Sequence, residues 1–126
     1  MTGETKEQLV ETISAFKISH ATLAKRLSQY KTLSDWRLPS EADMRSSGWV
    51  VDTLEVALWG LFKYDSWADG ALAVVNLGGD SDTAGAVYGA LAGAFYGFES
   101  IPSQWVEGMK NWKLIQEIAE GVSELV

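Results

Sequence analysis

One apolar segment near the middle of the chain has glycine at every fourth position: Gly85, Gly89, Gly93 and Gly97. Four residues are just over one helical turn, so these glycines share one face of a helix. Each glycine costs about 1 kcal/mol relative to alanine inside a helix. The segment is therefore predicted to have a neighbouring helix packed very closely against this face. Gly97 suits the C-terminal end of the helix.

The residues just before this helix form an acidic turn, Gly78-Gly79-Asp80-Ser81-Asp82-Thr83. The two carboxylates can face one ion, and the Thr83 hydroxyl can complete the edge of such a site. Oxygen ligands of this kind suit a hard cation such as Mg²⁺ or Ca²⁺. The same residues would also start a helix well without a metal, because acidic side chains favour the positive end of the helix dipole. The spacing alone leaves both interpretations open and slightly favours the helix cap.

The rest of the chain shows helical periodicity. Apolar residues spaced by three and four predict a first helix from about residue 5 to about residue 30. Residues 38–47 are predicted to be a linker with one helical turn. Further helices are predicted over Trp49–Tyr64, Trp67–Asn76, Asp80 or Ser81 to Gly97, Pro102–Met109, and a C-terminal segment that presents Leu114, Ile115, Ile118, Ala119, Val122 and Leu125. The predicted fold class is all-α, with about six helices in a single domain over residues 1–126.

Three other features give weaker signals. His20 is the only histidine and falls on the apolar stripe of the predicted first helix, so it is interpreted as a packed core residue rather than a ligand. Asp52 and Glu55 lie three positions apart on one predicted helix. They are either a second acidic pair or an exposed polar edge. Ser46-Ser47-Gly48 precedes that helix. Its backbone N–H groups could bind a phosphate at the helix N-terminus, but most such residues are helix caps.

Composition excludes several classes of function. The chain has no cysteine, which removes disulfides, zinc–thiolate sites and thiol catalysis. Residues 46–126 hold three basic and eleven acidic side chains, so no nucleic-acid partner is expected. The most apolar run, residues 84–98, is shorter than the roughly 20 residues of a membrane-spanning helix. Residues 1–30 lack the apolar core of a secretory signal. The sequence therefore predicts a cytoplasmic protein without membrane contact.

Three stretches of the sequence occur in a specific order and spacing. They are Gly48-Trp-Val-Val-Asp-Thr-Leu-Glu-Val-Ala-Leu-Trp59, Ala73-Val-Val-Asn-Leu-Gly-Gly-Asp-Ser-Asp-Thr-Ala-Gly-Ala-Val-Tyr-Gly-Ala-Leu-Ala-Gly-Ala-Phe-Tyr-Gly97 and Ile101-Pro-Ser-Gln-Trp105. Together they closely resemble the C-terminal half of the ADP-ribosylglycohydrolase family. The resemblance spans about residues 45–126.

The resemblance implies an all-α fold and hydrolysis of the glycosidic bond between ADP-ribose and a protein side chain, with two Mg²⁺ ions. It assigns metal ligands to Asp80, Asp82 and Thr83. The family's remaining ligands come from an N-terminal half with a Gly-Asp-(Ala/Ser)-x-Gly opening and a Thr-Asp-Asp segment, and neither occurs in this chain. The chain is therefore expected to be catalytically incomplete alone, and its catalytic residues stay unassigned.

The same resemblance carries expectations about partners. Helices that normally pack on the missing half would leave apolar surface bare, so a homodimer or another self-association is expected. The implied small molecule is an ADP-ribose-type ligand. Two alternatives stay open: a hydrolase completed by a second chain, and a non-enzymatic oligomeric helical module.

Overall fold

The computed structural model describes residues 5–109 and 112–124, which form helices joined by short turns. Over these residues no segment forms a strand, so the all-α prediction is confirmed. None of the helices described there is both long and apolar enough to cross a membrane. The elements are α1 (Lys6–Ala15), α2 (Ala21–Leu27), α3 (Leu33–Arg37), η1 (Glu41–Asp43), α4 (Val50–Lys63), α5 (Trp67–Val75), α6 (Ser81–Tyr96), η2 (Phe98–Ser100), α7 (Ser103–Glu107) and α8 (Trp112–Glu124).

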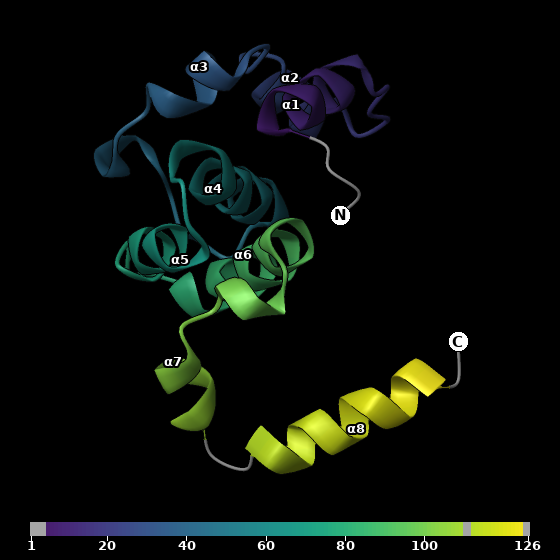
Figure 1. Ribbon diagram of the computed structural model, residues 1–126. Helices are drawn as coiled ribbons and strands as arrows, with labels where there is room; N and C mark the ends of the chain where they lie inside the picture. The colour runs from purple at the N-terminus through teal and green to yellow at the C-terminus, as the bar shows by residue number, and fades with distance from the viewer. Residues whose placement is uncertain (1–4, 110–111, 125–126) are drawn as a thin grey trace.

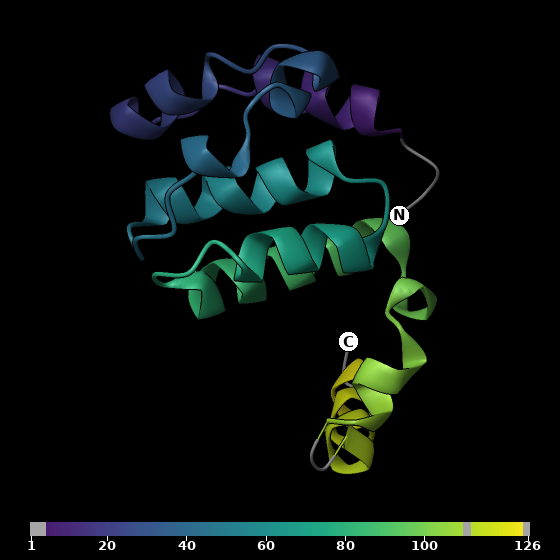
Figure 2. The same ribbon diagram turned by 90° about the vertical axis from the view of Figure 1, so that its left-hand side faces the viewer.

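Helix α4 is the central helix of the fold. Helices α1–α3 lie on one side of it, and α5 and α6 lie on the other (Figures 1 and 2). Its Val51, Val56, Trp59 and Phe62 have no exposed surface. Burying side chains of this kind stabilises a fold by about 1.5–3 kcal/mol each. Helix α8 lies apart from these layers, at the far end of α7 (Figure 1).

The single helix predicted over residues 5–30 is wrong, because the chain forms α1 and α2 with a break between them. Phe16 adopts extended backbone (φ −70°, ψ 131°) and is 70% exposed. His20 is exposed and caps α2, where its Nδ1 accepts a hydrogen bond from the Leu23 N–H at 3.1 Å. His20 is therefore a capping residue and not a packed core residue. The apolar spacing hid the break because both helices contribute apolar residues to the same core.

A short helix, α3, follows where the sequence predicted no element. Thr32 and Asp35 form a capping box at its start. Its Trp36 is fully buried and stacks on Tyr30, with ring centroids 3.8 Å apart. The predicted linker over residues 38–47 contains one turn of 3₁₀ helix, η1, as expected.

The sequence predicted a close helix crossing along the row of Gly85, Gly89, Gly93 and Gly97 (the glycine column). The structure has its closest crossing at another place. A Cβ on Gly85 would lie 3.2 Å from Val75, but one on Gly93 would meet nothing within 4 Å. Gly97 ends α6 with a positive φ of 91°, as predicted for a C-terminal residue. The tightest contacts are instead at Gly60 of α4 and Gly70 of α5, where added Cβ atoms would collide with neighbouring atoms.

The side chain that fills this crossing comes from α6. A Cβ on Gly60 would lie 2.6 Å from Val74 and 3.0 Å from the Tyr88 ring. A Cβ on Gly70 would overlap the Tyr88 hydroxyl and lie 2.7 Å from the Gly60 carbonyl oxygen. Tyr88 is buried, and its hydroxyl donates to the Trp67 carbonyl at 2.8 Å. Close packing of α6 is thus achieved by its tyrosine against glycines of the other two helices, and the glycine column contributes chiefly at Gly85.

Candidate functional site

The acidic turn connects α5 to α6. Gly78 and Gly79 both have positive φ, 76° and 60°, which carries the chain sharply into the first turn of α6. The Asp80 N–H donates to the Ser46 carbonyl at 2.7 Å, which ties the turn to the loop before α4. Asp80 stands at the N-cap position, but its side chain makes no capping hydrogen bond. Asp80 and Asp82 thus lie at the start of α6, as the helix-cap interpretation predicted, although no side-chain capping hydrogen bond forms.

The oxygen atoms of this turn are gathered together. The Thr83 hydroxyl donates to Asp80 Oδ1 at 3.1 Å, and the Thr83 N–H donates to Asp82 Oδ1 at 3.0 Å. A hydrogen bond with the Asp80 side chain lowers the pKa of Asp82, and the hydrogen bond from the Thr83 N–H adds to this effect. Asp80, Asp82 and Thr83 are thus close neighbours that offer carboxylate and hydroxyl oxygens near a helix N-terminus. This donor set fits a hard divalent cation.

The turn has too few oxygen ligands to complete a metal shell by itself. Among residues 5–109 and 112–124, no three histidine, aspartate or glutamate side chains come together as a metal site would require. Hard divalent cations take six or more oxygen ligands. Any cation at this turn would therefore draw further ligands from water or from another polypeptide segment.

The loop before α4 packs directly on the acidic turn. Gly48 has a φ of 83°, and a Cβ there would collide with the Asp80 carboxylate. A Cβ on Gly79 would in turn collide with the Ser46 carbonyl oxygen. The two backbone segments can approach this closely because both positions are glycine. The position of Asp80 thus depends on where residues 46–48 lie.

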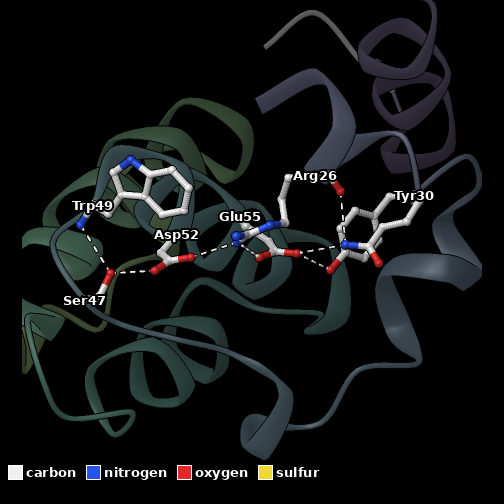
Figure 3. Close-up of polar contacts among 7 residues, drawn as sticks. Arg26, Tyr30, Ser47, Trp49, Asp52 and Glu55 are labelled. Carbon is white, nitrogen blue, oxygen red and sulfur yellow. Dashed lines mark hydrogen bonds and ion pairs between the residues drawn. The ribbon is translucent and has the colours of Figure 1, made fainter. Parts of the chain in front are cut away.

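Asp52 and Glu55 are buried, with 5% and 7% exposure, so the exposed-edge interpretation is wrong. They face α2, where Arg26 Nη1 binds Asp52 Oδ1 at 2.7 Å and Glu55 Oε1 at 2.9 Å (Figure 3). The Ser47 hydroxyl donates to Asp52 Oδ2 at 2.5 Å. The Tyr30 hydroxyl donates to Glu55 Oε2 at 2.5 Å. Figure 3 shows these contacts as one continuous network from loop to helix.

The network sets the charge states of its members. Burial raises the pKa of Asp52, but hydrogen bonds from Ser47 and Arg26 outweigh it, and the pKa lies below its usual range. The hydrogen bond to Asp52, followed by the one to Glu55, raises the pKa of Arg26. Burial and the Glu55 contact raise the pKa of Tyr30. Arg26 and Asp52 are thus a stable ion pair at neutral pH.

This ion pair gives stability a predictable pH dependence. The lowered pKa of Asp52 means that its stabilising effect is present above its unfolded pKa of about 3.9 and is lost as pH falls through the folded value. Asp52→Asn is expected to lower the free energy of unfolding by about 2 kcal/mol at neutral pH, and by progressively less as the pH falls below about 3.9. Urea unfolding monitored by tryptophan fluorescence over a series of pH values measures this.

Asp65→Asn is the matched control, because its partner Arg37 is 3.0 Å away but Asp65 is 82% exposed. An exposed pair of this kind is worth less than about 1 kcal/mol. An Asp52→Asn loss that was equal at neutral and acid pH would contradict the assignment.

Two hollows flank these groups. A groove of about 300 Å³ lies beside the acidic turn, and Asp82, Trp67 and Trp105 contribute to its lining. The two indole rings are 6.0 Å apart and meet edge to face. A larger cleft of about 710 Å³ lies beside Arg26 and Glu55, and its lining includes neither Asp80 nor Asp82. Of these two hollows, the smaller groove is the one that adjoins a predicted metal ligand, Asp82.

The protein is all-α, and carboxylate and hydroxyl oxygens of the acidic turn gather at the N-terminus of α6. The family model described as ADP-ribosylglycohydrolase matches residues 1–126, and the chain belongs to this family. The resemblance seen in the sequence is thereby confirmed.

Several relatives place the chain within that family. It is 41% identical over 78 residues to the ADP-ribosylarginine hydrolase Tri1 of Serratia proteamaculans, covering 62% of this chain and 21% of that protein. It is 40% identical over 82 residues to the ADP-ribosyl-[dinitrogen reductase] glycohydrolase of Rhodospirillum rubrum, covering 65% and 28%. An uncharacterized protein of Archaeoglobus fulgidus is 28% identical over 121 residues, covering 95% and 39%. The chain thus matches well under half the length of these relatives, and no solved structure gives a significant match.

Proposed function

We propose that this chain supplies one edge of a Mg²⁺ site in a hydrolase that cleaves the bond between ADP-ribose and a protein side chain. The observation that carries the proposal is the acidic turn, where the Asp80 side chain is free of capping hydrogen bonds and lies beside Asp82 and Thr83. The proposal is consistent with family membership and with relatives named as hydrolases of ADP-ribosylated arginine and of ADP-ribosylated dinitrogen reductase.

Within this proposal the three residues act as a ligand set. Asp80 and Asp82 supply negative charge, and Thr83 holds the Asp80 carboxylate through its hydroxyl. Bound divalent cations in such sites supply an activated water and stabilise charge at the reacting centre. Because the described residues hold no larger cluster of acidic or histidine side chains, we propose that the chain is catalytically incomplete alone. A second polypeptide segment would provide the remaining ligands.

The groove beside Asp82 supports an ADP-ribose-type ligand. Its walls combine two indoles, Trp67 and Trp105, with the carboxylate of Asp82. Aromatic side chains offer stacking surfaces for a base. An adenine ring on these indoles would keep the ribose end of the ligand near the acidic turn. A cytoplasmic location is part of the same proposal, and the absence of cysteine fits it.

Cation binding by the chain itself tests the proposal. Titration with Mn²⁺, followed by the loss of its free electron-paramagnetic-resonance signal, is expected to show one weak saturable class of sites that Mg²⁺ displaces. Asp82→Asn should weaken this binding by at least about tenfold, since each lost charged contact is worth about 1.5–3 kcal/mol.

The matched control is Asp69→Asn, which changes an exposed acid in the first turn of the neighbouring helix α5. It should leave the Mn²⁺ affinity unchanged. Equal effects of the two variants would contradict a site at the acidic turn.

A non-enzymatic oligomeric module is the second candidate function, and the exposed apolar residues of α8 favour it. Leu114, Ile115, Ile118 and Val122 are each about half exposed, as is Met109 nearby. Single exposed apolar residues are ordinary, but a contiguous row of them is typical of an interaction surface. We propose that the chain self-associates as a homodimer through such surfaces. The sedimentation mass of the chain in solution distinguishes this homodimer from a monomer.

A further inference from the structure

We propose that Ser47 and Asp52 are positioning residues that hold the acidic turn in place through the loop formed by residues 46–48. The significance of this role rests on the proposed function, because the turn carries the candidate cation ligands. Neither Ser47 nor Asp52 touches those ligands through its own side chain in the contacts described above. Their effect passes through the backbone of the loop.

The first step is the anchor inside the fold. Asp52 is 5% exposed and is fixed by Arg26 of α2 at 2.7 Å. The second carboxylate oxygen of Asp52 accepts a hydrogen bond from the Ser47 hydroxyl at 2.5 Å. The Trp49 N–H donates to the Ser47 oxygen at 3.3 Å, so Ser47 is held on both sides of its hydroxyl (Figure 3). One buried carboxylate thereby fixes an otherwise exposed loop to two helices.

The second step runs from the loop to the turn. The carbonyl oxygen of Ser46, the residue before Ser47, accepts a hydrogen bond from the Asp80 N–H at 2.7 Å. Gly48, the residue after it, lies so close to the Asp80 carboxylate that a Cβ would collide with it. The loop therefore contacts both the backbone and the side chain of Asp80. A shift of the loop must move the first ligand of the candidate site or break its hydrogen bond.

Asp52 thus acts on the candidate site through the loop and not as a ligand. Groups that orient metal ligands without touching the metal commonly change its affinity by about 10–100-fold. Ser47 is the better residue to vary, because it is exposed and its loss leaves the Arg26–Asp52 ion pair intact.

Amide hydrogen exchange measured by NMR tests the inference without any metal. In the full chain, Ser47→Ala should speed exchange at the Asp80 amide about fivefold, as expected for a weakened hydrogen bond. Ser47→Thr keeps the hydroxyl and should restore the wild-type rate. Asp52→Asn should act in the same direction as Ser47→Ala. Ser100→Ala is the control, because its hydroxyl binds the Gly97 carbonyl at the other end of α6, at 2.6 Å.

The Mn²⁺ titration of the same variants separates this inference from the proposed function. Ser47→Ala should weaken Mn²⁺ binding about tenfold, and Ser47→Thr and Ser100→Ala should not. If wild-type chain binds no Mn²⁺ but Ser47→Ala still loosens the Asp80 amide, the cation site fails and the positioning role stands. If the Asp80 amide exchanges equally in the wild type, Ser47→Ala and Asp52→Asn, the positioning role is overturned whatever the metal does.

Discussion

Replacing Gly70 with alanine is expected to lower the free energy of unfolding by about 3 kcal/mol or more. The added Cβ would overlap the Tyr88 hydroxyl and lie 2.7 Å from the Gly60 carbonyl oxygen. Neither neighbour can yield easily, since one is backbone and the other is a buried ring whose hydroxyl binds the Trp67 carbonyl at 2.8 Å. A loss of this size is a large fraction of the 5–15 kcal/mol that typically stabilises a folded domain.

Gly93→Ala provides the matched control for this prediction. It makes the same chemical change inside α6, where a Cβ would meet nothing within 4 Å. Alanine should therefore raise the free energy of unfolding by about 0.5–1 kcal/mol through its better helix propensity. Urea titrations followed by circular dichroism measure both variants. Effects of equal sign and size would show that the crossing at Gly70 is looser than the structure indicates.

Asp82→Ala is expected to reduce Mg²⁺-dependent release of ADP-ribose by about a thousandfold when the chain is combined with the remaining half of an ADP-ribosylglycohydrolase. A bound cation contributes several kcal/mol of charge stabilisation, and each 1.4 kcal/mol is a factor of ten in rate. Because Asp82 is exposed at the start of α6, its loss should leave the fold intact. Release of ADP-ribose from a labelled protein substrate, with the Mg²⁺ concentration varied, measures the effect.

Asp69→Ala should leave that reconstituted activity close to wild type, because this acid lies in the first turn of α5 and not in the acidic turn. An intact activity in Asp82→Ala would exclude Asp82 as a ligand. An activity of the chain without any added half would instead overturn the proposal that it is catalytically incomplete.

The central helices could be predicted closely from the sequence. The boundaries of α4, α5 and α6 lie within about one residue of the predicted ones. These helices combine strong apolar periodicity with clear ends, such as Ser66 before α5 and Gly97 after α6. Periodicity and capping residues were sufficient to predict these helices because the apolar faces they indicate are the faces that pack in the folded structure.

The predictions failed where the local signal was weak or where partners are distant in sequence. The break before His20 contains no glycine or proline, so the apolar periodicity predicted one continuous helix across it. The burial of Asp52 and Glu55 depends on Arg26, which is 26 and 29 residues away along the chain. The spacing of two acids on one helix does not say which basic residue will cover them. Arg26, within the predicted first helix, is the signal that could have indicated a basic partner for them.

The glycine column was informative about α6 but assigned the close contact to the wrong helix face. A row of glycines shows that a face has no side chains, and it does not say what fills the space. Here Tyr88 projects from α6 into the space left by Gly60 and Gly70. The metal ligands and the oligomeric state stay predictions, because neither depends on contacts within this chain alone.

The crossing of Gly60, Gly70 and Tyr88 also limits how this fold can diverge. The three positions come from three helices and pack against one another, so a side chain added at either glycine would disturb the packing of all three helices. A Cβ at Gly60 would also meet Val74, and one at Gly70 would meet the Gly60 carbonyl oxygen, so a smaller side chain at position 88 alone would not make room for either. Homologues that replace either glycine are therefore expected to carry compensating changes at more than one neighbouring position.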